Sequence, residues 1–152
     1  MHRPGCKCEI CKELHQIKRE LRELIEFLKH QPTGISIQQL QGEFFMPITG
    51  VTPGGTNTFG EVPTPSGSAF PAGTTFTWSV DDTADISLTP SSSGTSVATA
   101  CSATPTQTSF NLTCTSNYTP VGAPGPVAAT VNVPILAVTP PTPTGMTINQ
   151  LS

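Results

Sequence analysis

Residues 9–31 read EICKELHQIKRELRELIEFLKHQ and form the only part of the chain with a sustained helical period. Apolar side chains recur there at alternating steps of four and three residues, which is the a/d pattern of a heptad repeat. The resulting seam consists of Ile10, Leu14, Ile17, Leu21, Leu24 and Leu28. The pattern predicts a coiled-coil-type α-helix that packs against other helices.

The identities of the seam residues indicate how many helices meet. All a positions are leucines (Leu14, Leu21 and Leu28), and the d positions are isoleucines apart from Leu24. Leu at a with Ile at d favours trimers or tetramers over dimers. We therefore expect a homo-oligomer, with a trimer favoured. The alternative is an amphipathic helix that folds back on its own domain.

Charge divides the 152-residue chain into two different segments. All seven Lys and Arg and all three His precede Gln31, and the remainder carries only five acidic residues, so the formal net charge is −3. A balanced helix and an acidic remainder argue against nucleic-acid binding. Without His, Lys or Arg beyond residue 31, the remainder has no obvious catalytic base or cationic stabiliser, so we expect no enzyme activity.

No apolar run reaches the length of a membrane span, and the N-terminus lacks the apolar core of a signal peptide. We therefore expect a chain without a membrane span that is made and folded in a cytoplasm.

A cluster of potential metal ligands lies at the N-terminus, where Cys6, Cys8, Cys11 and His15 fall within ten residues. These are ligand types that zinc accepts, and Cys11 and His15 share one helix face. A second interpretation uses the heptad register, in which Cys6 at g and Cys11 at e lie between neighbouring helices and form interchain disulfides. Plain thiols are the third. The expectation is no cofactor, or zinc if the first interpretation holds.

The pattern changes after residue 31, where Pro32 and Gly34 end the helix. Ile35 and Ile37 alternate with polar residues, and short Thr- and Val-rich stretches follow, separated by Gly, Pro, Ser and Asn. These stretches are 44–48, 75–80, 86–88, 96–101, 109–114 and 127–136. They predict a β-sandwich over residues 32–139, with a helical segment 1–31 before it and a Pro-rich linker with a terminal strand, 140–152, after it.

Several of these stretches carry a family resemblance. Pro47-Ile48-Thr49, the stretch Phe76-Thr77-Trp78-Ser79-Val80-Asp81-Asp82, the stretch Ile86-Ser87-Leu88-Thr89-Pro90 and a Val-rich closing strand resemble bacterial immunoglobulin-like domains. Such domains occur on cell surfaces and tailed-phage virions, and usually without the two cysteines found here. With an oligomerising segment in front, the architecture resembles phage capsid decoration and head-fibre proteins.

The resemblance implies a structural protein on a virion surface, assembled in the host cytoplasm. Its partners would be a capsid or other virion protein and, more weakly, cell-surface glycans. The alternatives are a bacterial surface or extracellular filament subunit joined through its terminal strand, and a small zinc-binding assembly protein.

Two further groups of residues in the predicted β domain are candidate sites. Cys101 and Cys114 would face each other in a hairpin centred near Gln107, which predicts a disulfide, with buried thiols as the alternative. Asp81, Asp82 and Asp85 offer oxygen ligands for calcium, although a solvated acidic corner is the simpler interpretation.

An internal repeat links the two ends of the β region. Residues 32–41 read PTGISIQQLQ, and residues 143–152 read PTGMTINQLS. Both copies are either ordinary strand openers or strands that occupy equivalent slots. In the second case Met146 and Ile148 would pair beside Ile35 and Ile37, or take their place in another subunit.

Overall fold

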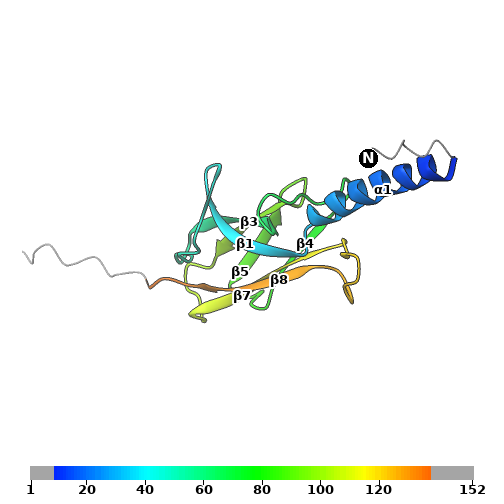
Figure 1. Cartoon of the computed structure of the whole chain (residues 1–152). Helices are drawn as coiled ribbons and strands as arrows, with labels where there is room; N and C mark the ends of the chain where they lie inside the picture. Colours follow the sequence, from blue (N-terminus) through cyan, green and yellow to red (C-terminus); the bar gives the residue numbers. More distant parts are fainter. Residues whose placement is uncertain (1–8, 138–152) are drawn as a thin grey trace, which may run out of the picture.

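The structure, a computed structural model, describes residues 9–137. It contains a helix, α1 (Glu9–Lys29), that projects from one end of a β body formed by residues 34–137 (Figure 1). The last strand leads to the opposite end of this body. The strands are β1 (Gly34–Gln41), β2 (Phe44–Met46), β3 (Thr56–Thr64), β4 (Phe76–Val80), β5 (Ile86–Pro90), β6 (Ser96–Cys101), β7 (Ser109–Ser116) and β8 (Ala128–Pro134).

The charges and the end of α1 follow from the local sequence. Glu9 lies in the first turn and Lys29 in the last, so each complements the partial charge of its helix end. Beyond Lys29, the backbone N–H groups of His30 and Gln31 bond to carbonyls three residues back, which tightens the final turn. Pro32 then has no N–H with which to continue the helix.

The strands form two antiparallel sheets, one in the order β2-β1-β3-β6-β5 and the other in the order β4-β7-β8. Both contribute to a single hydrophobic core, since Phe59 and Val97 of the first sheet and Leu112 and Val133 of the second are completely buried. The prediction of a mainly β protein with an N-terminal helix is therefore confirmed.

One central strand was not predicted from the sequence. β3 lies between β1 and β6 in the larger sheet, yet its residues TNTFGEVPT contain a glycine and a proline. Both residue types weaken a strand pattern. The glycine has a specific role, because a Cβ added to Gly60 would lie 2.9 Å from Cε1 of Phe45 and 3.2 Å from Cδ1 of Leu40. The side chains of Leu40 and Phe45, from the β1–β2 hairpin, thus lie close against the backbone of β3 at Gly60.

The predicted hairpin between Cys101 and Cys114 is wrong. Cys101 ends β6, which pairs with β3 and β5, whereas Cys114 lies in β7, which pairs with β4 and β8. The segment between them crosses from one sheet to the other instead of turning back within one sheet. Both cysteines are buried free thiols, as the alternative interpretation expected.

Candidate oligomerisation surface

The apolar seam of α1 is open to solvent. None of the side chains of α1, residues 9–29, is buried, and the predicted seam residues are between 43% and 74% exposed. Ile25 and Phe27 widen the stripe toward the C-terminal end of the helix and are also exposed. The alternative prediction, in which the helix folds back on its own domain, does not describe this structure. The apolar face therefore lacks a covering surface within the described chain.

The polar face of α1 stabilises the helix only modestly. Lys29 Nζ lies 2.7 Å from Glu26 Oε1, and Gln16 Nε2 donates to Glu20 Oε1 at 2.9 Å. The hydrogen bond from Lys29 holds the pKa of Glu26 below its ordinary value. Exposed pairs at these spacings contribute about 0.2–0.5 kcal/mol each. A helix with 21 residues and no packing partner is marginal in water, so the seam is the natural source of further stabilisation.

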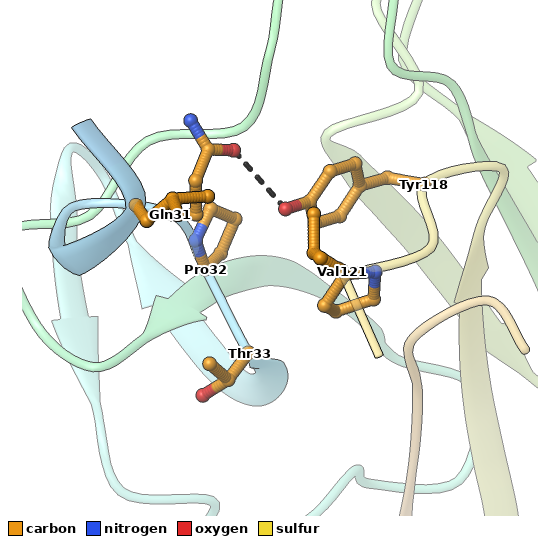
Figure 2. Close-up of a pocket in the computed structure, with 7 residues that line it drawn as sticks. Gln31, Pro32, Thr33, Tyr118 and Val121 are labelled. Atoms are coloured by element: carbon orange, nitrogen blue, oxygen red, sulfur yellow. Dashed lines mark hydrogen bonds between the residues drawn. The ribbon is translucent and has the colours of Figure 1, made fainter. Parts of the chain in front are cut away.

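A groove marks the junction between α1 and the β body. This junction groove has a volume of about 210 Å³ and is lined by Leu28, Gln31, Pro32, Thr33, Tyr118, Pro120 and Val121. Figure 2 shows the side chains that follow α1 on one side and those of the β7–β8 loop on the other. The hydroxyl of Tyr118 donates a 3.0 Å hydrogen bond to Gln31 Oε1 across it. Tyr118 also makes an edge-to-face contact with Phe70, which holds its ring in place.

Only Cys11 and His15 of the N-terminal cluster lie within the described residues. Cys6 and Cys8 lie outside the described residues, so the zinc site and the interchain disulfide both stay predictions. His15 Nδ1 lies 2.9 Å from the carbonyl oxygen of Cys11. Among residues 9–137, no group of three or more His, Cys, Asp or Glu side chains is arranged to hold a metal ion.

The three aspartates after β4 serve the loops around them. Asp85 is buried, not solvated as the simpler interpretation expected, and its Oδ2 accepts hydrogen bonds from the backbone and hydroxyl of Thr106. These bonds, the backbone one first, hold the pKa of Asp85 below its usual value. Asp81 accepts from the backbone and side-chain N–H groups of Asn111, while Asp82 Oδ1 caps the turn that follows it. Each carboxylate thus has its own neighbours within the protein.

The first copy of the internal repeat lies within the described residues, and the second lies outside them. Ile35 and Ile37 lie in β1 with side chains buried in the core, and they face Pro63 and Glu61 of β3. Met146 and Ile148 lie outside the described residues, so their predicted pairing stays a prediction.

Comparisons with protein-family models, with curated proteins and with solved structures yield no match. Within residues 9–137, no helix is both long enough and apolar enough to cross a membrane.

The junction groove was not predicted from the sequence, although α1 was. Leu28 and Gln31 occupy a and d positions of the heptad, so the heptad pattern in the sequence reaches one side of the groove. Tyr118 and Val121, by contrast, are about ninety residues away in the sequence. Nothing in their local pattern indicates that the β7–β8 loop meets the end of α1.

Proposed function

We propose that this chain is a structural display subunit whose α1 helices associate into a parallel coiled coil and carry the β bodies outward. The observation that carries this proposal is the open apolar seam on a helix that touches its own β body only at one end. The β body already buries a complete core of its own. Another copy of α1 is the surface that matches a heptad seam, because it presents the same repeat.

The charges beside the seam support a parallel arrangement. In a parallel coiled coil, a residue at g lies next to the e residue of the following heptad on the neighbouring helix. Glu13 occupies g, and Lys18 occupies the next e position, so opposite charges meet between chains. An antiparallel pair would instead bring the g positions together, with Glu13 and Glu20 among them. Like charges there oppose association.

The strand order supports an immunoglobulin-like identity for the β body. Without the short β2, the sheets read β1-β3-β6-β5 and β4-β7-β8. This order corresponds to the ABED and CFG sheets of the constant-type immunoglobulin fold. Trp78 lies buried on β4, the equivalent of strand C, beside Cys114 on β7. The resemblance noted in the sequence and this strand order together favour a bacterial immunoglobulin-like domain.

A virion surface is the setting that this combination suits best. Immunoglobulin-like domains carried by an oligomerising segment resemble capsid decoration and head-fibre proteins, in which the segment docks on the particle and the domain faces outward. The chain would then contact a capsid or other virion protein at α1 and, weakly, host surfaces through the β body. Finding the chain in purified particles would test this setting separately from its assembly.

The assembly itself is tested with the full chain and its Leu21→Asp variant. Leu21 lies in the middle of the seam, and burying a charge in an apolar interface costs several kcal/mol. We expect multi-angle light scattering to give a trimer for the natural chain and a monomer for Leu21→Asp.

The matched control is Gln16→Asp, which introduces the same charge at an outward-facing c position and should leave the trimer intact. A natural chain that stays monomeric at high concentration would contradict the proposal.

A further inference from the structure

We propose that, in this assembly, Phe27 of one chain inserts into the junction groove of its neighbour and thereby fixes the angle between the coiled coil and the β bodies. The inference rests on the proposed self-association of α1. It goes further, because a coiled coil alone leaves each β body held only through the end of its own α1.

The first step is that the groove continues the seam. Leu28 is the last a residue, and Gln31 falls on the following d position. Both line the junction groove. The backbone N–H groups of His30 and Gln31 bond to carbonyls three residues back, so Gln31 stays close to the end of α1. The groove therefore opens on the side of α1 that faces the neighbouring helices.

The second step is the position of Phe27. It lies at g and is 63% exposed. In a parallel coiled coil, a g side chain flanks the a residue of the neighbouring helix at the same level, so Phe27 lies beside Leu28 of the next chain. Leu28 lines the junction groove of that chain. A parallel assembly thus brings an exposed aromatic ring to the groove of each neighbour.

The third step is that the groove suits an aromatic occupant. Its volume of about 210 Å³ exceeds the cavity of about 150 Å³ that holds a benzene ring. Its walls include Pro32, Pro120 and Val121, and Val121 is 86% exposed without an occupant. The Tyr118 hydroxyl is already bonded to Gln31, so the polar group at the rim is satisfied (Figure 2). An inserted ring would bury apolar surface without breaking this hydrogen bond.

The test is a disulfide trap between differently substituted chains. In a background with Cys6, Cys8 and Cys11 replaced by Ser, one chain carries Phe27→Cys and a second carries Val121→Cys. The two are unfolded together, refolded and oxidised, and then separated on a denaturing gel without reductant. We expect a linked pair containing one chain of each kind. In the control, the first chain carries Glu23→Cys, at an outward-facing c position, and keeps Phe27. This pair of chains should not become linked.

A second measurement does not depend on engineered cysteines. Phe27→Ser should weaken association roughly tenfold, which is the loss expected for one buried aromatic contact. The control Phe44→Ser removes another exposed phenylalanine, on β2, and should leave association unchanged.

The two outcomes that contradict the inference are distinguishable. Trimers that form normally but give no linked pair and tolerate Phe27→Ser would overturn the groove contact and leave the proposed coiled coil standing. Chains that remain monomeric would overturn both.

Discussion

Glu61 is an acidic side chain turned toward the core. It lies on β3 two residues after the fully buried Phe59 and therefore on the same face of the strand. Its Oε2 is buried and meets no hydrogen-bond partner among residues 9–137. Burial raises the pKa of Glu61 above its ordinary value. The same neighbourhood raises the pKa of Cys114 to about 12, through burial first and the charge of Glu61 second.

This carboxyl predicts a pH-dependent cost to stability. Because its pKa is higher in the folded protein than in the unfolded chain, its favourable contribution is complete below about pH 4.3 and is lost as the pH rises through the folded pKa. We expect Glu61→Gln to raise the free energy of unfolding at neutral pH by an amount on the order of 1 kcal/mol. The gain in the free energy of unfolding should vanish below about pH 4.3.

Urea unfolding followed by the fluorescence of Trp78, at two pH values, measures the effect. Glu43→Gln, in the exposed turn between β1 and β2, is the matched control and should show no such difference between the two pH values. An equal effect of Glu61→Gln at both pH values would contradict the assignment of the cost to ionisation.

At the scale of elements, β3 depends on the absence of a side chain at Gly60. A Cβ there would lie within 2.9 Å of the Phe45 ring, closer than ordinary contacts allow. Phe45 is half exposed on the edge strand β2 and has some room to move, whereas Leu40 in β1 is held between β2 and β3. A substitution at Gly60 should therefore loosen the β1–β2 hairpin and leave the core intact.

We expect Gly60→Ala to lower the free energy of unfolding by about 1–2 kcal/mol, the usual cost of overpacking. Adding Phe45→Ala removes the nearest contact and should recover part of this loss, which denaturant unfolding of the two single variants and the double variant would measure. Gly125→Ala is the control, since a Cβ there meets nothing within 4 Å. Strictly additive effects at Gly60 and Phe45 would show that the two sites do not interact.

At the scale of the whole molecule, the buried core belongs to the β body alone, and the helix does not contribute to it. α1 contributes no buried side chain, while the core of the β body draws only on residues after Gly34. Contact between the two is concentrated at the junction groove, with the Gln31–Tyr118 hydrogen bond across it. The β body should therefore not need α1 in order to fold.

Removal of residues 1–29 should accordingly yield a folded monomer. Gln31 and Pro32 remain in this variant, so the Gln31–Tyr118 hydrogen bond is kept although Leu28 is lost from the groove wall. Light scattering would report the mass, and circular dichroism with thermal unfolding would report the β structure. A truncated chain that still forms trimers would locate the assembly surface in the β body and contradict the role given to α1.

The helix, its end and most strands were determined by short-range sequence patterns. The heptad of residues 10–28 needs only neighbouring residues to specify an amphipathic helix, and Pro32 stops it without tertiary help. Alternating Thr- and Val-rich stretches likewise indicate strands, because side chains in a strand point to opposite faces in turn. These rules act within a few residues, so they can be read from the sequence alone.

Only the tertiary structure decided which strands pair and what the C-terminal end of α1 meets. Cys101 and Cys114 were predicted in one hairpin because they are near in sequence, yet the chain crosses between sheets there to complete both of them. β3 was missed because Gly60 is favoured by a close approach of β1 and β2 that local composition does not record. The junction groove joins Gln31 to Tyr118 by a contact between distant segments. Long-range packing determines such features, and propensity and periodicity describe only the chain's immediate neighbourhood.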